Sequence, residues 1–156
     1  MFSSLIRSID CIIEPIDGKG GLYLGNFNAA NDVPNLKKMK IKAVLTVANA
    51  SYLSYNKSDI PNHKIIPAED YESFNLLVYF DDGIEFIEKN LENTNVLCHC
   101  LAGVSRSATL VIAYLMKTKR LTYLKALALT LSKRSIIYPN GGFTRQLMEF
   151  EKDLKL

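Results

Sequence analysis

The residues best suited to chemistry lie in one short run, "HCLAGVSRS", at positions 99–107. This run places a cysteine, Cys100, and an arginine, Arg106, at the two ends of a short segment that contains Gly103. Apolar residues precede and follow the run, so we predict a tight loop between a buried strand and a buried helix. A polar loop held rigidly at both ends is suited to binding or catalysis.

The loop is predicted to bind an anion. A helix N-terminus presents unpaired N–H groups and the positive end of the helix dipole. Gly103 permits backbone conformations in which successive N–H groups converge, and the guanidinium of Arg106 adds a planar fork of donors that matches phosphate oxygens. Cys100 faces this positive field, which favours its thiolate form, and a thiolate beneath a bound phosphate is an in-line nucleophile.

Two neighbours of Cys100 each allow two interpretations. His99 could act as a general base, as in a cysteine hydrolase, but adjacent residues on a strand point to opposite faces. We therefore expect His99 to support the loop structurally, by hydrogen bonding to nearby backbone. Cys98 is predicted to lie on the same strand face as Cys100. It is either a small buried hydrophobic residue or a resolving thiol that protects Cys100 from over-oxidation.

The start of the predicted helix carries two serines. Ser105 and Ser107 are both suited to capping a helix, and the Ser107 hydroxyl can also hydrogen-bond the thiolate and ease its departure from a phosphorylated intermediate. The run "CHC" supplies soft metal ligands, but three consecutive strand residues cannot all face one ion, and Cys11 and His63 are the only other Cys and His residues. We expect no metal and no other cofactor.

Composition indicates a globular protein with one domain, spanning residues 1–156. A hydrophobic content of 48% in 156 residues is enough for a sizeable core. The net charge of +3 is small, and no concentrated basic stripe indicates a nucleic-acid partner. Three cysteines and no leader pattern favour a reducing compartment, the cytoplasm, with the nucleus also open to the protein. No apolar run approaches the roughly 18 residues that indicate a membrane span.

Strands and helices alternate around the loop. Strands are predicted at residues 20–26, 41–48, 63–67 and 95–100, and helices at residues 28–40, 74–91, 105–117, 122–134 and 142–156. The alternation favours an α/β fold with a central, mostly parallel, twisted sheet flanked by helices on both faces. Ligands bind such sheets beyond the carboxyl ends of the strands, which is where the predicted loop lies.

The run also matches the His-Cys-x5-Arg-Ser signature of cysteine-dependent protein phosphatases, and the chain resembles the dual-specificity phosphatases of the small atypical type. The matching segments are "LYLGN", "VLTVA", "IPAEDYESFNLLVYF", "VLCHCLAGVSRSATLVIAYLM" and "YPNGGFTRQLMEFEKDL". The resemblance implies a protein-tyrosine-phosphatase-like fold. It also implies hydrolysis of phosphotyrosine and phosphoserine or phosphothreonine in proteins through a cysteinyl-phosphate, by a route that calls for no metal.

The resemblance further implies roles for individual residues. Cys100 would be the nucleophile, Arg106 would bind the phosphate and stabilise the transition state, and Ser107 would assist breakdown of the cysteinyl-phosphate. The backbone amides that cradle the phosphoryl oxygens would be those of Leu101, Ala102, Gly103, Val104, Ser105 and Arg106. Asp70 in "AED" matches the general acid, which this chemistry needs because a seryl or tyrosyl oxygen leaves poorly unless protonated. Glu69 is the rival for that role.

Several other residues border the predicted site. Asn140 in "YPNGGF" matches a family position, although we interpret it as a turn residue. Glu69, Tyr71, Leu101 and Val104 are predicted to border the mouth of the pocket.

The partner expected for such a site is a phosphorylated protein, with protein kinases among the candidates, and the oligomeric state is left open. Two alternatives compete with a protein phosphatase. One is a phosphate-reading module that barely turns over, but such a module would not need both a thiolate and an acid. The other is a phosphatase for a lipid head group or an RNA 5′ phosphate, but "LAGVS" lacks the basic residues that those relatives often carry in the loop.

Overall fold

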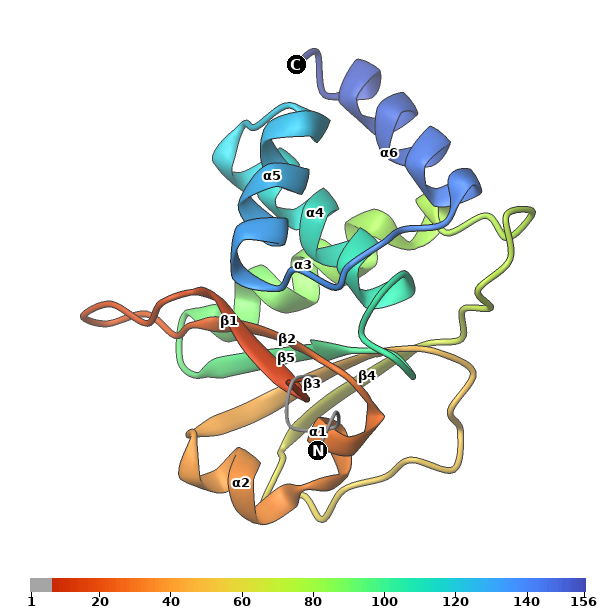
Figure 1. The fold of residues 1–156 in the computed structure, drawn as a ribbon. Helices are drawn as coiled ribbons and strands as arrows, with labels where there is room; N and C mark the ends of the chain where they lie inside the picture. The colour runs from red at the N-terminus through yellow and green to blue at the C-terminus, as the bar shows by residue number, and fades with distance from the viewer. Residues whose placement is uncertain (1–6) are drawn as a thin grey trace.

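A sheet with the strand order β1-β2-β5-β3-β4 organises the chain in the computed structural model, which describes residues 7–156 (Figure 1). The strands are β1 (Ile9–Ile13), β2 (Leu22–Gly25), β3 (Ile41–Val47), β4 (Asn62–Ile66) and β5 (Asn95–His99). All neighbouring strands are parallel except β1, which runs antiparallel to β2. The predicted α/β fold with a mostly parallel sheet is therefore confirmed.

The edge strand β1 was not predicted from the sequence. Its segment "IDCII" interrupts an apolar run with Asp10, and its register against β2 shifts between Cys11 and Ile13. An antiparallel neighbour needs no crossover helix, so β1 stands outside the alternation of strands and helices that marks the rest of the chain.

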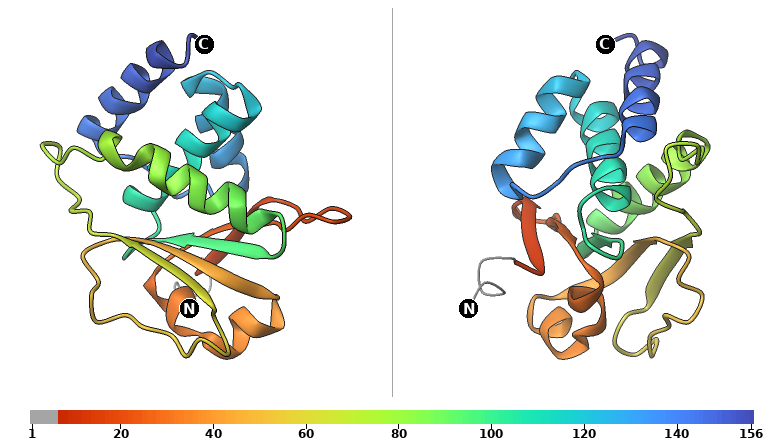
Figure 2. Two further views of the ribbon diagram at one scale, coloured as in Figure 1. Left: turned by 180° about the vertical axis from the view of Figure 1, so that it is seen from behind. Right: turned by 45° about the vertical axis from the view of Figure 1, so that its right-hand side comes forward.

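Helices cover both faces of the sheet (Figures 1 and 2). One face carries the short helices α1 (Phe27–Asn31) and α2 (Val33–Lys38), and the other carries α3 (Phe80–Leu91), α4 (Arg106–Lys119), α5 (Tyr123–Lys133) and α6 (Gly141–Asp153). Each face has its own cluster of buried hydrophobic side chains. Residues 107–116 of α4 are all buried, which confirms the prediction of a central helix.

Two predicted helices have different bounds in the structure. The helix expected over residues 28–40 is divided at Asp32, whose side chain accepts a hydrogen bond from the backbone N–H of Asn35 and so starts α2 afresh. The helix expected from residue 74 begins with a 3-10 turn, Leu77–Tyr79, and becomes α-helical only at Phe80.

The late start of α3 has a tertiary cause. The backbone N–H groups of Leu76 and Leu77 both donate to Oε1 of Gln146, on α6, at 2.8 and 2.9 Å. A side chain far along the chain therefore satisfies donors that the sequence pattern assigns to the helix itself.

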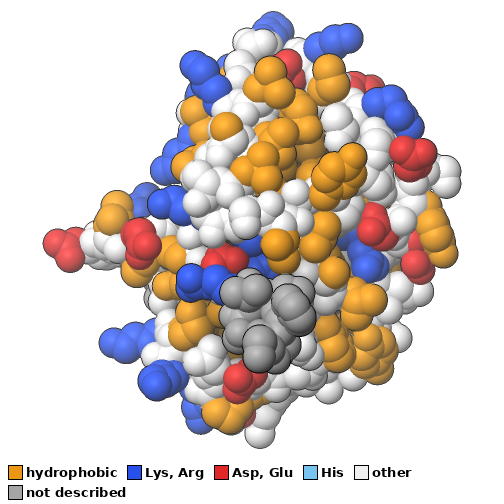
Figure 3. Space-filling view, viewed as in Figure 1, with side chains coloured by type: hydrophobic (Ala, Val, Ile, Leu, Met, Phe, Trp, Pro, Cys, Tyr) orange, Lys and Arg blue, Asp and Glu red, His pale blue; other side chains and the backbone are white. Residues whose placement is uncertain are grey.

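The surface carries charges of both signs. On the face shown in Figure 3, Lys and Arg side chains are scattered among Asp and Glu, with no continuous basic stripe. The absence of a nucleic-acid partner stays a prediction. Within residues 7–156, every helix is too short or too polar to cross a bilayer.

Candidate active site

Cys100 lies at the carboxyl end of the central strand, directly after β5 ends at His99. It is 2% exposed and is the first residue of the loop that joins β5 to α4. The Cys100 Sγ lies 3.1 Å from the Oγ of Ser107, which is in the first turn of α4. A hydroxyl at this distance can donate a hydrogen bond to a thiolate, which stabilises the negative charge on sulfur.

The loop requires glycine at position 103. Gly103 has a φ of +66°, in the left-handed region that favours glycine. A Cβ on this residue would lie 2.6 Å from the carbonyl oxygen of Gly25, at the end of β2, and 2.7 Å from the guanidinium of Arg134. The loop backbone is therefore clamped closely between two other parts of the chain.

The backbone N–H groups of the loop are unpaired. Among the described residues, the N–H groups of residues 102–106 donate to no protein acceptor. Ser105 occupies the N-cap position of α4, but its side chain makes no cap hydrogen bond, and its Oγ instead accepts from the backbone N–H of Asn140 at 3.0 Å. Ser105 is therefore at the cap position, as predicted, but its side chain makes no capping hydrogen bond, so the first amides of α4 are left available to an anion.

Arg106 provides further donors next to these amides. Its Nη1 donates to the carbonyl oxygen of Ala68 at 3.0 Å, which ties the side chain to the loop after β4. Its Nε is buried and has no hydrogen-bond partner among the described residues. Because an unpaired buried donor costs about 1–3 kcal/mol, this N–H is a group that an acceptor from a ligand would satisfy.

Asp70 is connected to the loop through Asn140. The Asn140 Nδ2 donates to Oδ1 of Asp70 at 2.9 Å, and the backbone N–H of Asn140 donates to Ser105. The Oδ1 of Asn140 accepts from the N–H of Phe143 and caps α6. Asn140 thus does more than form the predicted turn, since it joins the loop after β4, the loop after β5 and α6.

Glu69, the rival acid, is held elsewhere. Its Oε1 accepts a hydrogen bond from Nδ2 of Asn49 at 3.1 Å. Of the residues predicted to border the mouth, Leu101 and Tyr71 are 60% and 63% exposed, while Val104 is half-buried.

His99 belongs to a chain of hydrogen bonds on the α1 and α2 face of the sheet. Its Nδ1 lies 3.1 Å from the carbonyl oxygen of Cys100, and its Nε2 lies 2.7 Å from Oγ1 of Thr46. The same Thr46 oxygen lies 2.8 Å from Nε2 of His63. Strands β5, β3 and β4 each contribute one member, so these hydrogen bonds cross three neighbouring strands of the sheet.

The direction of these hydrogen bonds follows from the charge on His99. Burial lowers the pKa of His99 to about 4, with the nearby His63 and Arg106 lowering it further and the bond to the Cys100 backbone opposing them. Burial also lowers the pKa of His63. In a neutral His99 ring, Nδ1–H donates to the Cys100 carbonyl and Nε2 accepts from the Thr46 hydroxyl, which in turn accepts from His63 Nε2–H.

Cys98 fits a small buried residue better than a resolving thiol. Its side chain is fully buried, and its Sγ contacts the carbonyl oxygen of Ser107 at 3.7 Å. Burial, and to a lesser extent the neighbouring Cys100, raises the pKa of the Cys98 thiol well above its ordinary value. A protonated thiol without solvent access is a poor nucleophile.

Three residues that contact the site were missed from the sequence. Thr46 and His63 extend the hydrogen bonds of His99, and Arg134 contacts the loop backbone. Only Thr46 could have been noticed in the sequence, because it is the one polar residue in a strand segment that is otherwise apolar from residue 43 to 47. No group of three or more His, Cys, Asp or Glu side chains in residues 7–156 is arranged to hold a metal ion.

Comparison with known proteins gives a consistent result. Residues 22–153 match the family model described as dual specificity phosphatase, catalytic domain. The chain is 44% identical over 133 residues to human dual specificity protein phosphatase 22, covering 85% of this chain and 71% of that protein. It is 39% identical over 137 residues to dual specificity protein phosphatase 1 of Arabidopsis thaliana, covering 87% of this chain and 68% of that protein.

Solved structures share the fold. The crystal structure of human tyrosine phosphatase-like serine/threonine/tyrosine-interacting protein superposes with a TM-score of 0.81 and 30% identity, covering 96% of this chain and 100% of that chain. Human DUSP28 superposes with a TM-score of 0.85 over 96% of this chain and 97% of that chain, and at 23% identity this likeness concerns the fold alone.

Proposed function

The chain belongs to the dual specificity phosphatase family and is a protein phosphatase, and we propose that Cys100, Arg106, Asp70 and Ser107 carry its reaction. The substrates are phosphotyrosine and phosphoserine or phosphothreonine in proteins. The observation that supports the assignment of residues is that Cys100 begins a loop in which, among the described residues, the N–H groups of 102–106 and the buried Arg106 Nε have no partner. These donors match the oxygens of a phosphoryl group.

In the first step, the Cys100 thiolate attacks phosphorus, so a sulfur–phosphorus bond forms as the bond to the substrate oxygen breaks. The loop amides and the guanidinium of Arg106 stabilise the negative charge on the phosphoryl oxygens. Asp70 gives its proton to the departing oxygen, which leaves as the hydroxyl of the dephosphorylated side chain. The hydrogen bond from Asn140 supports this role by holding one carboxylate oxygen of Asp70.

In the second step, water attacks the cysteinyl-phosphate and the sulfur–phosphorus bond breaks. Asp70, now ionised, accepts a proton from the attacking water. The Ser107 hydroxyl lies 3.1 Å from the sulfur and donates to it as negative charge returns to Cys100. The products are inorganic phosphate and the original thiolate, so the enzyme is ready for another substrate.

His99 is proposed to position the nucleophile rather than to exchange protons with the substrate. Its Nδ1–H holds the carbonyl of Cys100, and its other nitrogen is bonded to Thr46. Both ring nitrogens are therefore engaged with the protein, which fixes the orientation of the ring and of the peptide that carries the sulfur.

The physiological partner is proposed to be a phosphoprotein in a signalling pathway, with protein kinases among the candidates. We further propose a location in the cytoplasm or the nucleus. Support for a protein rather than a lipid or RNA substrate comes from the loop between Cys100 and Arg106, which carries no basic side chain beyond Arg106 itself.

The experiment that tests this function is turnover of a generic aryl phosphate by the purified chain. We expect turnover between pH 5 and 8 that is abolished in Cys100→Ser, while this variant still retains phosphopeptides on an array. A phosphate-reading module is the second candidate, since one structural neighbour is named a tyrosine phosphatase-like interacting protein. Such a module would retain the same peptides without turnover in the unaltered chain. Absence of turnover throughout this pH range would contradict the enzyme.

A further inference from the structure

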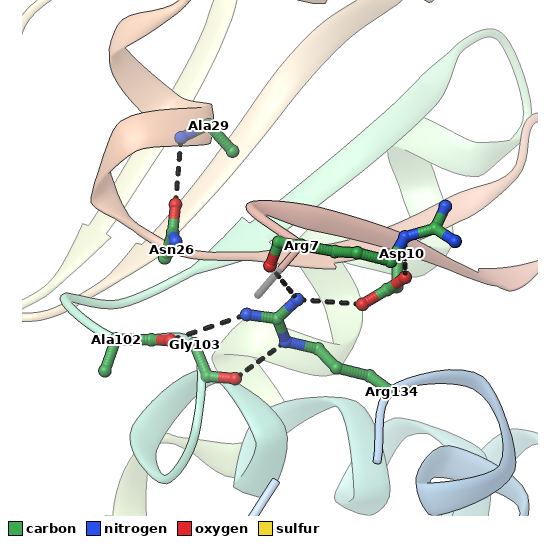
Figure 4. A network of polar contacts seen from close by, with 7 residues as sticks. All are labelled: Arg7, Asp10, Asn26, Ala29, Ala102, Gly103 and Arg134. Atoms are coloured by element: carbon green, nitrogen blue, oxygen red, sulfur yellow. Dashed lines mark hydrogen bonds and ion pairs between the residues drawn. The ribbon is translucent and has the colours of Figure 1, made fainter. Parts of the chain in front are cut away.

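Arg134 is a buried cation outside the residues assigned to the reaction. It follows α5 directly, and its side chain is 1% exposed. Figure 4 shows its guanidinium pointing into the space between β1 and the loop after β5. Its Nε donates to the carbonyl oxygen of Gly103 at 2.9 Å, and its Nη2 donates to that of Ala102 at 3.4 Å. Both acceptors belong to the loop proposed to hold the phosphate.

The positive charge of Arg134 is balanced by the carboxylate of Asp10, on β1. The Arg134 Nη1 lies 2.8 Å from Oδ2 of Asp10, and the same nitrogen donates to the carbonyl oxygen of Arg7 at 2.8 Å. Asp10 is itself buried and also pairs with the exposed side chain of Arg7. Because a buried guanidinium is costly without a charged partner and satisfied donors, these contacts together favour one position of the side chain.

The carbonyls that Arg134 holds determine where two loop amides point. In a trans peptide the C=O of one residue and the N–H of the next lie in one plane and point in opposite directions. Holding the Ala102 carbonyl against Arg134 therefore turns the N–H of Gly103 away from Arg134. Holding the Gly103 carbonyl does the same for the N–H of Val104. Both N–H groups are among the unpaired amides of the loop.

We propose that Arg134 is a positioning residue, which aims the amides of Gly103 and Val104 at the phosphoryl oxygens by holding the two preceding carbonyls. It acts from outside the pocket and touches no substrate atom. The close packing of Gly103 between Arg134 and the carbonyl of Gly25 leaves the loop backbone little room to rotate. The inference rests on the proposed function, in which this loop cradles the phosphate.

The test uses inorganic phosphate, a product of the reaction, as the probe. Arg134→Lys keeps the positive charge beside Asp10, but one ammonium cannot reproduce the fork that reaches both carbonyls. We expect its inhibition constant for phosphate to rise roughly tenfold or more and its kcat/KM for an aryl phosphate to fall about 10²-fold. The amide NMR signals of Gly103 and Val104 should move in the phosphate-free protein.

Two control variants separate positioning from loss of stability. Asp10→Asn removes the ion pair, but its amide oxygen can still accept from Nη1 of Arg134, and the three carbonyl acceptors of Arg134 remain. Its phosphate inhibition constant should therefore stay within about threefold of that of the unaltered chain. Leu91→Ala, at the end of α3 and buried in the hydrophobic core, lowers thermal stability through a cavity at the end of β5 opposite to the loop. It too should leave the phosphate inhibition constant within about threefold.

The double variant Asp10→Asn with Arg134→Gln leaves no uncompensated buried charge, and it replaces Arg134→Lys if that protein does not fold. Phosphate inhibition within about threefold of the unaltered chain, in Arg134→Lys or in the double variant, would overturn the inference. An equal loss in Leu91→Ala would also overturn it, because instability alone would then explain the effect. Failure of the unaltered chain to bind phosphate would instead contradict the proposed function.

Discussion

Acid is expected to destabilise the folded chain through His99. Burial lowers the pKa of this residue from 6.5 to about 4, so the folded protein holds it neutral at pH values where the unfolded chain protonates it. Between these two values the unfolded state binds more protons, and the free energy of unfolding falls as the pH falls. Below about pH 4 both states are protonated and this contribution stays lost.

The magnitude follows from the same two pKa values. Each unit by which the pKa of His99 differs between the folded and unfolded states corresponds to about 1.4 kcal/mol of stability. Most of the pH range between these two pKa values lies above pH 5. Lowering the pH from 7 to 5 should therefore decrease the free energy of unfolding by about 2 kcal/mol through His99 alone. This is a large fraction of the stability of a chain of this size.

Urea denaturation of the full chain, followed by circular dichroism at pH 7, 6 and 5, measures this effect. Carboxylates also titrate as the pH falls, so the informative quantity is the difference in pH dependence between the unaltered chain and His99→Gln. His99→Gln should lose less stability than the unaltered chain over this range, by about 2 kcal/mol. His63→Gln, at a half-buried position, should remove a smaller part. Parallel pH dependences for the unaltered chain and His99→Gln would refute the reasoning.

Three further predictions concern the reaction. Asp70→Asn should lower kcat for a phosphopeptide by roughly 10²- to 10⁴-fold, whereas the matched variant Glu69→Gln should stay close to the unaltered chain; the opposite order would assign the acid to Glu69. Ser107→Ala should slow hydrolysis of the cysteinyl-phosphate more than its formation, so stopped-flow turnover of an aryl phosphate should begin with a burst; an unchanged steady rate without a burst would contradict this. Arg106→Lys should recover little of the activity lost in Arg106→Ala, and activity within about tenfold of the unaltered chain would show that a point charge suffices.

Local patterns explain what was predicted correctly from the sequence. The loop after β5 lies between two apolar runs, and its cysteine, glycine and arginine fall within a few residues of one another. The central helix α4 was also recognised, because its residues are apolar nearly all round. In both cases the prediction depends only on residues that are close together in the sequence.

Contacts between distant segments explain what was missed. Nothing near Arg134 in the chain indicates that its side chain reaches Asp10 on β1, and β1 itself breaks the alternation of strands and helices. The sequence around Asn140 indicates only a turn. Its hydrogen bond to Asp70 joins positions 70 residues apart, so no local pattern indicates that contact. The late start of α3 likewise depends on Gln146, a side chain in the last helix.

The contacts of Arg134 also bear on when activity first arises during synthesis. Through Arg134 the loop is joined to Asp10 and Arg7, which precede Arg134 by 124 and 127 residues. Pairs separated so widely form late, because closing a long segment loses conformational entropy before the contact stabilises it. The strand, loop and helix that carry Cys100 leave the ribosome before Arg134 does. We therefore expect the loop of a nascent chain to lack two of its carbonyl contacts, and its activity to stay low, until Arg134 has followed α5 out of the ribosome.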